Sequence, residues 1–384
     1  MTTNRTRGQN EASIYKRKSD GYWVGAVTVA SGRRKVVYAK VRADVVRKVD
    51  EIRATLSQGI QLPKRMTITE LITLWLEAKK PTVRPTTFQG YELTLGKHVL
   101  PNIGTLRISK VTPSDFEQLY KTCSETISPK SIRNMHAALK QAFDWAVRRD
   151  WISRNPAALI AATDLPKIVR KPPTVITPGE ARKLIDVAVG TRSEAIIALA
   201  VTTGARVGEL QGVTWDRLSL SENADKPSTL RIDRALQYLD GKPELVEPKT
   251  PSGVRTLTLT ATASASLKRL RIKQNEDALR LGSKWSNRMN LVFVTETGQP
   301  LNRRQVLKQY FRPLLKEAGL PPMMQFHTLR HAAASLLLAD GVPVPLVSSM
   351  LGHSTPAFTM AIYSHAIPNS QHIAATAMDA LLGN

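Results

Sequence analysis

The residues best suited to chemistry lie close together near the C-terminal end of the sequence. The stretch QFHTLRHAAASLLL, residues 325–338, places His327, Arg330 and His331 within five positions. On a helix, two histidines spaced i, i+4 could bind a metal, whereas a histidine and an arginine spaced i, i+3 could bind a phosphate. A plain amphipathic helix that begins with polar residues is the third interpretation. The rest of the chain has to decide among the three.

Metal binding is the weakest of these interpretations. The zinc motif of metalloproteases needs a glutamate directly after the first histidine, and position 328 is a threonine. Asp340 is the only acidic residue between positions 318 and 378, so the clustered carboxylates of a two-metal nuclease are absent there. The sequence also has no glycine-rich nucleotide loop of the Walker type. We therefore expect a chemistry that needs neither a metal nor ATP.

Further candidate residues lie in four other segments. TGARVGEL places Arg206 after a Thr-Gly pair and Glu209 three positions later. EPKTPSG places Lys249 at the start of an expected hairpin turn, LGHS places His353 after a glycine, and MAIYSHA contains Tyr363. Taken singly, each favours an ordinary structural role: a surface ion pair for the arginine, a solvated turn for the lysine, a helix cap for the histidine and a core position for the tyrosine.

Taken together, the set indicates metal-free phosphoryl transfer. Two arginines can stabilise the negative charge that spreads over a pentacoordinate phosphate, without help from a cation. A lysine with a lowered pKa can protonate a leaving alkoxide. A tyrosine hydroxyl is a good covalent nucleophile for DNA, because its phosphodiester conserves the bond energy and permits religation.

The charge of the chain indicates a polyanionic partner. The sequence has 55 Lys and Arg against 31 Asp and Glu, a net charge of +24. Residues 1–60, 61–170 and 171–384 each contribute +8, so the charge is not a detachable basic tail. Such a distribution favours double-stranded DNA, bound by all parts of the chain through phosphate neutralisation, over a merely basic surface.

Composition also predicts the compartment. A single cysteine, Cys123, excludes a disulfide framework and favours a reducing cytoplasm. No window approaches 18 consecutive apolar residues, so no membrane span is expected. The N-terminus lacks the apolar stretch of a secretory signal. We therefore expect a cytoplasmic protein.

Residues 1–62 are expected to form a small sheet followed by a helix. SIYKR, YWVGAVTVA and RKVVYAKV are typical of three antiparallel strands, with turns at Asp20-Gly21 and Ser31-Gly32. The segment VRADVVRKVDEIRATLSQG predicts the helix. A basic sheet of this kind can enter a major groove of DNA.

Residues 63–160 are expected to form a helical domain. Thr67 and Glu70 predict a capping box at the start of its first helix. Leu71, Leu74, Trp75 and Ala78 follow at helical spacing and are predicted to share one face, the buried one.

A proline-rich linker, residues 161–174, is expected to precede the last domain, residues 175–384. That domain is predicted to be mostly helical, with TLRIDRALQYL, PELVEP and VRTLTLT as strands of one small sheet. The fold class is therefore a multidomain, mainly α protein with small β-sheets.

In their order and context, TGARVGEL, PKT, HTLRH, LGH and Tyr363 resemble the motifs of the tyrosine recombinases, and specifically the phage-type site-specific integrases. The motifs extend over about residues 173–370, and their combination is specific although each piece alone is weak. The resemblance implies an arm-binding sheet domain, a SAM-like helical core-binding domain, and a mixed α/β, mostly helical catalytic domain with a C-terminal tail.

The resemblance implies a chemical role for each matching residue. Tyr363 is the nucleophile, which attacks the scissile phosphate and becomes linked to the DNA 3′-phosphate, freeing a 5′-hydroxyl. Lys249 protonates the leaving 5′-oxygen. Arg206 and Arg330 bind the non-bridging oxygens of the phosphate.

The remaining matches are implied to assist these groups. His327 assists proton transfer around the nucleophile, His353 hydrogen-bonds the phosphate, and Glu209 supports the helix of the first arginine. One position after Arg330, His331 points about 100° away around the helix, so we interpret it as a structural residue.

The implied reaction is conservative exchange between two DNA duplexes at core and arm attachment sites. A homotetramer cuts and religates one strand pair at a time through a Holliday junction, and so integrates and excises a mobile element, such as a phage genome, in a bacterial host cell. The tail after Tyr363 packs either on a neighbouring protomer or on its own domain. The sequence does not decide whether an excisionase or a host DNA-bending protein takes part.

Three alternative functions remain. A Xer-like resolvase of chromosome or plasmid dimers would use the same chemistry, but that resemblance would start near residue 66 and leave the N-terminal sheet unexplained. A type IB topoisomerase would use similar residues but needs no tetramer and no defined sites. A DNA-binding regulator without catalysis is disfavoured, because all six catalytic positions hold the expected residue types.

Overall fold

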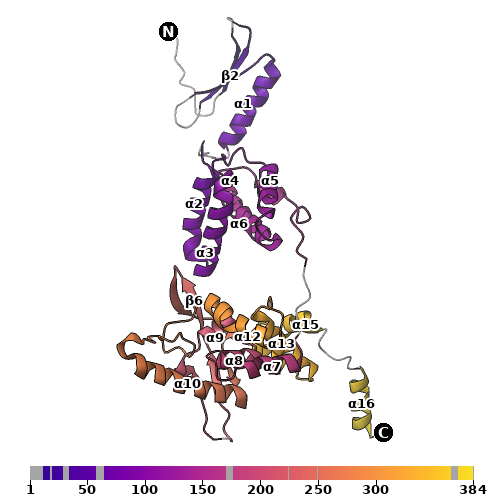
Figure 1. The fold of residues 1–384 in the computed structure, drawn as a ribbon. Coiled ribbons are helices and arrows are strands. Elements are labelled where there is room, and N and C mark those ends of the chain that lie inside the picture. The colour runs from indigo at the N-terminus through magenta and orange to yellow at the C-terminus, as the bar shows by residue number, and fades with distance from the viewer. Residues whose placement is uncertain are drawn as a thin grey trace. The chain divides into compact units, whose positions relative to one another are not determined.

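The computed structural model describes residues 12–17, 20–28, 34–57, 65–169, 176–223, 225–248, 250–364 and 371–383. The chain divides into two compact units, Met1–Arg170 and Lys171–Asn384 (Figure 1). Whether the first unit contains two separate functional domains, as the sequence predicts, stays a prediction.

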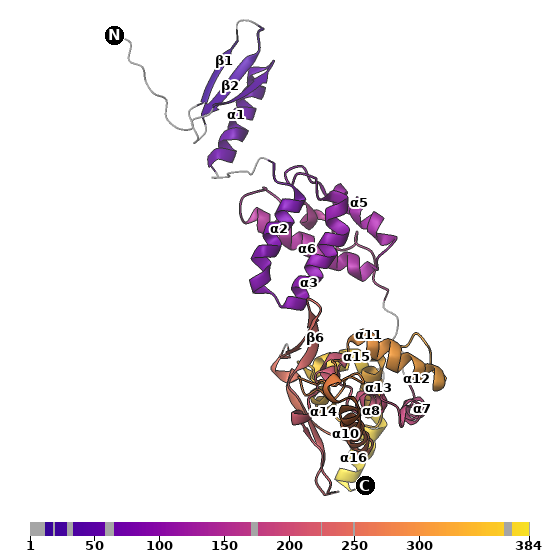
Figure 2. The ribbon, with the colours of Figure 1, turned by 60° about the vertical axis from the view of Figure 1, so that its left-hand side comes forward.

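The predicted N-terminal sheet and helix are present. The elements are β1 (Ala12–Lys16), β2 (Trp23–Thr28), β3 (Arg34–Ala39) and α1 (Arg42–Ser57). The strands are antiparallel in the order β1-β2-β3, and α1 lies along the sheet (Figure 2). A side-chain atom at Gly25 would lie 2.5 Å from Val49, so the glycine lets α1 approach the central strand closely. The predicted turn at Ser31-Gly32 lies outside the described residues.

Five helices form the rest of the first unit: α2 (Ile68–Lys79), α3 (Pro85–Thr94), α4 (Leu100–Ile103), α5 (Pro113–Ser124) and α6 (Pro129–Val147). The capping box is confirmed, since the Thr67 amide donates to the Glu70 carboxylate at 2.7 Å. The predicted buried face of α2 was partly wrong. Leu71 is buried beside Trp75, but Leu74 is 39% exposed, because it lies one position off the i, i+4 row that faces the core.

The first part of the expected linker packs on these helices. Leu165 is 6% exposed within their hydrophobic core. The Arg133 guanidinium donates to the backbone oxygens of Pro166 at 2.9 Å and Ala162 at 3.0 Å. These bonds hold residues 161–166 against α6. The first six residues of the expected linker therefore pack on the helical core of the first unit.

The second unit is built around one buried helix. Its helices are α7 (Pro178–Ala188), α8 (Glu194–Thr203), α9 (Val207–Gln211), α10 (Ala261–Leu281), α11 (Arg303–Gln305), α12 (Arg312–Glu317), α13 (His327–Ala339), α14 (Val344–Leu351), α15 (Pro356–Tyr363) and α16 (Gln371–Leu382). Helix α8 is apolar on all sides and packs against α7, α10 and α13. Its C-terminal end therefore holds the following turn in a fixed place among these helices.

The strands of the second unit form two sheets, where the sequence predicted one. The first contains β4 (Leu218–Ser219), β5 (Thr229–Ile232) and β8 (Arg255–Thr258), and the second contains β6 (Ala235–Leu239) and β7 (Lys242–Val246). Asp240 and Gly241 have φ angles of 49° and 77°, the geometry of a tight hairpin turn, which folds β7 back on β6. Strands β7 and β8 therefore do not pair, and the connection between them joins two sheets instead of closing a hairpin.

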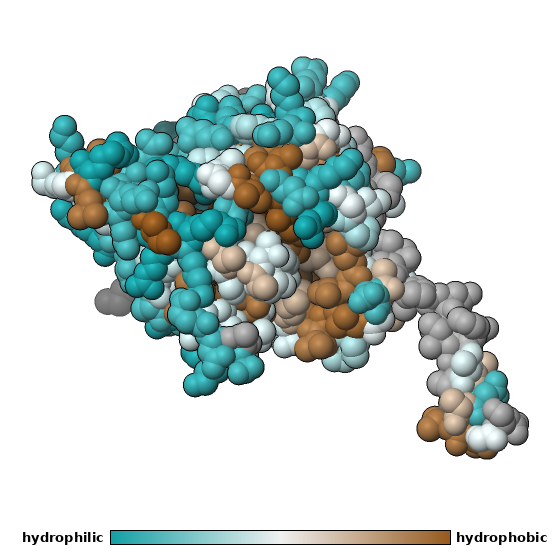
Figure 3. All heavy atoms as spheres, turned by 60° about the horizontal axis from the view of Figure 1, so that its bottom comes forward, coloured by the Kyte–Doolittle hydropathy of each residue, from teal (hydrophilic) through white to brown (hydrophobic). Residues whose placement is uncertain are grey.

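The face shown in Figure 3 is largely hydrophilic, with patches of hydrophobic residues. On the second unit, exposed apolar side chains include Leu346 on α14 and Phe358 on α15, and Leu381 on α16 is 80% exposed. Whether α16 packs on its own or on a neighbouring protomer stays a prediction. Within the described ranges, no helix combines the length and apolar character needed to cross a membrane.

Candidate active site

The first predicted arginine is positioned by the turn between α8 and α9. Gly204 ends α8 with a φ of 62°, a left-handed conformation that glycine adopts without strain. A side-chain atom there would lie 2.6 Å from Leu351, so glycine also permits the close approach of α14. Arg206 follows as the N-cap of α9, and its side chain is 44% exposed. The turn, fixed by the end of α8, thus places the guanidinium of Arg206 at the protein surface.

Glu209 binds two arginines. Its Oε1 accepts from Arg206 Nη1 at 2.7 Å, and its Oε2 accepts from Arg255 Nη2 at 2.8 Å. Burial alone would raise the pKa of this carboxyl, but the hydrogen bond and charge of Arg255, together with Arg206, hold the pKa below its usual value. Glu209 is therefore ionised at neutral pH, and it supports the first arginine as predicted.

Arg330 connects two of the predicted motifs. It is 3% exposed, and it donates from Nη1 to the Gly204 oxygen at 2.9 Å and from Nη2 to the Leu351 oxygen at 2.8 Å. Burial, and then the charge of Arg206, lower its pKa to about 10, so it remains positive at neutral pH. One guanidinium therefore fixes the turn before Arg206 to the end of the helix before His353.

His353 lies just past the end of α14. Gly352 has a φ of 67°, and a side-chain atom there would lie 2.8 Å from Arg255 Nη1. His353 is 8% exposed, and its Nδ1 pairs with Thr359 Oγ1 at 2.8 Å. Burial, and then the charge of Arg330, lower its pKa to about 4, so the ring is neutral at pH 7. Its Nε2 is therefore able to act as a neutral hydrogen-bonding group.

The sequence predicted that His331 points away from the site as a structural residue, but the structure places it in contact with Tyr363. Its Nδ1 lies 2.7 Å from the Tyr363 hydroxyl oxygen, and the ring of His327 packs edge-on against it at 4.9 Å. The prediction measured the angle from Arg330, but the spacing i, i+4 places His331 only about 40° from His327, compared with about 60° for Arg330. The two histidines therefore share a face of α13 and form a row that leads to the tyrosine.

Tyr363 is the last residue of α15 and is 1% exposed. Its ring packs with Leu338, Val347 and Leu351. Burial raises the pKa of its hydroxyl, an effect that the charge of Arg330 partly offsets. The phenol is protonated and enclosed, so its hydroxyl is not presented to a phosphate in this conformation.

Lys249 lies outside the described residues, so its predicted role has no structural test. Its neighbours Pro248 and Thr250 line a pocket that also contains three arginines. Among the residues that the structure describes, no three His, Cys, Asp or Glu side chains come together as metal ligands would. The metal-free chemistry remains a prediction from the sequence.

One residue at the site, Arg255, was not predicted from the sequence. It is 9% exposed, and its Nε donates to the Met350 oxygen at 2.6 Å while its Nη2 binds Glu209. A signal was present: in β8 the buried positions alternate, and Arg255 shares the inward face with Leu257. An arginine at an inward strand position needs a partner, which points to a buried ion pair.

The assembled groups are suited to binding an anion. Three guanidinium groups, Arg206, Arg255 and Arg330, surround one buried carboxylate, Glu209, and its oxygens are already used by two of them. His353, neutral at pH 7, comes from the same helix end that Arg330 binds. A phosphate that enters beside Arg206 meets donors and positive charge.

Two family models match the chain. The model described as "Phage integrase family" matches residues 174–370, and the model described as "Phage integrase, N-terminal SAM-like domain" matches residues 67–124. The first match alone covers more than half of the chain and includes the arginines, the histidines and the tyrosine described above.

Individual relatives and solved structures agree with these models. A "tyrosine recombinase XerC-like" protein of Caldanaerobacter subterraneus is 29% identical, with 90% of this chain and 93% of that protein covered. The "ICEBs1 integrase" of Bacillus subtilis is 26% identical, with 92% of each covered. The solved Tn1549 transposon integrase, in complex with circular intermediate DNA, is similar in fold, with a TM-score of 0.66 at 23% identity over 82% of this chain and 99% of that one.

Proposed function

The chain belongs to the phage integrase family, and we propose from this premise that it is a site-specific tyrosine integrase, which integrates and excises a mobile element by cutting and rejoining DNA. One observation carries the proposal. The buried Arg330 binds the backbone on both sides of the site, at Gly204 and at Leu351, and so brings the TGAR and LGH motifs to one place. Burial of the Arg330 charge costs desolvation free energy. A guanidinium fixed in this way is suited to stabilise the negative charge of a phosphate.

In the proposed mechanism, the arginines bind the scissile phosphate. Arg206 is exposed enough to contact DNA, while Arg330 and Arg255 supply positive potential from the protein side. Glu209 already binds Arg206 and Arg255, and backbone oxygens bind Arg330, so the three side chains need little reorganisation when the phosphate arrives. His353 donates a hydrogen bond to the same phosphate.

Tyr363 then attacks the phosphorus atom, and its oxygen forms the 3′-phosphotyrosyl bond as the bond to the 5′-oxygen breaks. Lys249 gives its proton to that leaving oxygen, and the proton of the tyrosine passes to His327 once the end of α15 has moved the hydroxyl away from His331. Burial, and then the neighbouring His331 and Arg330, lower the pKa of His327 to about 4, so its ring is a neutral acceptor at pH 7. Religation is the same reaction in reverse, and no metal or ATP takes part.

The partners follow from the same proposal. Duplex DNA is the substrate, which agrees with the DNA in the Tn1549 integrase complex. The sheet of residues 1–62 contacts arm sites, the helices of residues 63–160 contact the core site, and four protomers assemble on two duplexes. An excisionase and a host DNA-bending protein are candidate regulators of direction.

A Xer-like dimer resolvase is the second candidate, because a XerC-like relative also aligns over most of the chain. A resolvase acts between two copies of one site, whereas an integrase joins two different sites. Recombination between unlike attachment sites, with no reaction between identical ones, separates the two functions.

Trapping of the covalent intermediate tests the proposal. A nicked attachment-site duplex loses its short strand after cleavage, so the protein stays attached to the DNA. We expect the wild-type chain to give this adduct, and Tyr363→Phe to abolish it while DNA binding is retained. Binding of the site without any adduct from the wild-type protein would rule out the enzyme.

The chain offers a matched control for this substitution. Tyr120 is 4% exposed, and its hydroxyl lies 3.0 Å from His136 Nδ1, as that of Tyr363 pairs with His331. Tyr120→Phe therefore removes the same kind of buried Tyr–His hydrogen bond in the first unit. We expect this variant to form the adduct at the wild-type rate.

A further inference from the structure

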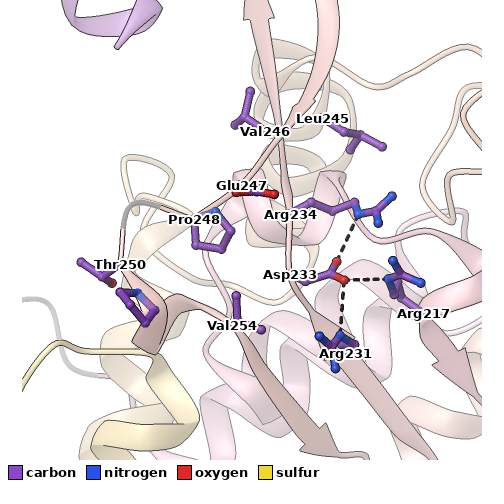
Figure 4. A pocket seen from close by; sticks show the side chains of 11 residues that line it. Arg217, Arg231, Asp233, Arg234, Leu245, Val246, Glu247, Pro248, Thr250 and Val254 are labelled. Carbon is purple, nitrogen blue, oxygen red and sulfur yellow. Dashed lines mark hydrogen bonds and ion pairs between the residues drawn. The ribbon is translucent and has the colours of Figure 1, made fainter. Parts of the chain in front are cut away.

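Three arginines share one carboxylate next to the segment of Lys249. Asp233 accepts from Nε of Arg217 at 2.8 Å, of Arg234 at 3.1 Å and of Arg231 at 3.3 Å (Figure 4). Burial alone would raise the pKa of Asp233, but the hydrogen bond and charge of Arg217, with those of Arg234, hold it below its usual value. The ionised carboxylate therefore holds three guanidinium groups together.

The cluster lies where the chain crosses between the two sheets. Asp233 and Arg234 connect β5 to β6, and residues 247–254 connect β7 back to β8. Both crossings line one open pocket of about 690 Å³. Arg231 and Arg234 lie on one wall, and Pro248 and Thr250, the neighbours of Lys249, lie on the other. The pocket thus adjoins the segment that carries the proposed general acid.

The pocket has donors that Asp233 does not use. All three arginines reach the carboxylate through Nε, so the outer Nη edges of Arg231 and Arg234 make no hydrogen bond with the described residues. The side chain of Arg231 is 57% exposed and that of Arg234 is 31% exposed. Three arginines outnumber the two carboxylates of the lining, Asp233 and Glu247. An incoming anion therefore finds guanidinium edges that are already fixed in position.

We propose that this pocket binds a backbone phosphate of duplex DNA close to the cleavage position, with Arg231 and Arg234 as its ligands and Asp233 as the residue that positions them. The site lies outside the proposed catalytic set and deepens the proposed function, on which it rests. Phosphates fix the register of a protein on a duplex without reading its sequence. A phosphate held here places the 247–254 crossing, and Lys249 with it, against the DNA strand.

A salt titration of DNA binding tests this site. Arg231→Gln and Arg234→Gln are combined in the full chain that carries Tyr363→Phe, so that cleavage does not interfere, and binding is measured on a mixed-sequence duplex. Each neutralised phosphate contributes about 0.9 to the slope of log K against log salt. We expect the slope to become shallower by about one to two such contacts, with about tenfold weaker binding at low salt.

The control removes two exposed arginines of the same unit, each of which forms an ion pair. Arg182, on α7, is 78% exposed and binds Asp186, and Arg280, on α10, is 61% exposed and binds Asp277. We expect Arg182→Gln with Arg280→Gln to leave the slope nearly unchanged. An equal fall in this control, or an unchanged slope in the test variant, would overturn the site.

Two further arms cover folding and the nature of the anion. Arg231→Lys with Arg234→Lys keeps both charges but loses the fork that reaches Asp233, and we expect it to retain most of the slope if the charges bind phosphate. Thermal unfolding with inorganic phosphate tests a small-anion site: stabilisation that Gln substitution removes, with the DNA slope unchanged, would assign the pocket to a free anion. The slopes do not depend on cleavage, so a failed adduct assay would reject the proposed function separately.

Discussion

At the level of single residues, one buried carboxylate organises the positive charge of the site. Glu209 holds Arg206 on one oxygen and Arg255 on the other, and Arg330 is held by backbone oxygens instead. No further acid is needed, because the carbonyls satisfy the third guanidinium without neutralising it. The site therefore keeps an excess of positive charge for the phosphate.

The hydrogen bond between His331 and Tyr363 leads to the first residue-level prediction. In this structure the bond retains the hydroxyl in a buried position, and a hydrogen bond of this kind contributes about 1 kcal/mol net. Replacement of His331 by Phe keeps the ring but removes the bond, so we expect first-strand cleavage to become about fivefold faster, measured as the rate of adduct formation. Loss of cleavage would show instead that His331 accepts the proton of the nucleophile directly.

His353 makes stability depend on pH. Its pKa is lowered to about 4 in the folded chain, from about 6.5 when unfolded, so between these values only the unfolded state binds the proton. Acidification from pH 6.5 to 4 therefore destabilises the fold, on the order of 3 kcal/mol through this residue. In His353→Asn, which can keep the bond to Thr359, we expect a correspondingly shallower loss in urea unfolding across this window. Parallel pH profiles would contradict the buried neutral histidine.

The sequence singled out Arg206, Arg330 and His353, and the structure brings their segments together through Arg330. The sequence also predicted that Glu209 supports Arg206. It could not predict Arg255, because the partner of an inward arginine on a strand depends on which segments pack over it. It predicted that His331 points away from the site, because the helical angle was measured from Arg330 and not from His327. The role of Lys249 remains a prediction.

At the level of elements, glycines set how closely the parts of the site approach. Strand β6 packs against α9, the helix that begins just after Arg206. A side-chain atom at Gly212, at the end of α9, would lie 2.7–2.9 Å from backbone atoms of Leu236 and Ala235. Backbone atoms of a strand cannot move aside as a side-chain tip can, so this contact admits only glycine.

A matched pair of substitutions on α9 tests this packing. Gly208 lies on the same helix, and an added atom there would meet the Leu236 oxygen at 3.4 Å, an ordinary contact. We expect Gly212→Ala to lower the free energy of unfolding by about 1–3 kcal/mol and to slow cleavage. Gly208→Ala should be neutral or stabilising by up to about 1 kcal/mol, since alanine favours helix. Equal effects in thermal unfolding would contradict the predicted asymmetry.

Local signals predicted most of the elements. The strands of the N-terminal sheet and the capping box at Thr67 are present as expected. The division of residues 229–258 into two sheets was missed, although Asp240-Gly241 marks a tight hairpin turn. Pairing of β5 with β8 joins segments more than 20 residues apart, and local patterns do not specify such contacts.

At the level of the whole molecule, the positive charge belongs to every part of the chain. The net charge of +24 is shared by the sheet, the first helices and the catalytic unit. Part of this charge is concentrated in the arginine pocket, which contains three arginines and is also lined by the neighbours of Lys249 in the sequence. The sequence predicted the DNA partner from the charge, but the pocket depends on two sheet crossings that only the fold brings together.

The most direct test of the central claim is the chemical identity of the protein–DNA bond. The full wild-type chain is trapped on a nicked attachment-site duplex and digested, and the DNA-linked peptide is identified by mass spectrometry. The account predicts a bond from the hydroxyl of Tyr363 to the 3′-phosphate of the cleaved strand, with a free 5′-hydroxyl on the other side. A bond through any other residue, or to a 5′-phosphate, would contradict it.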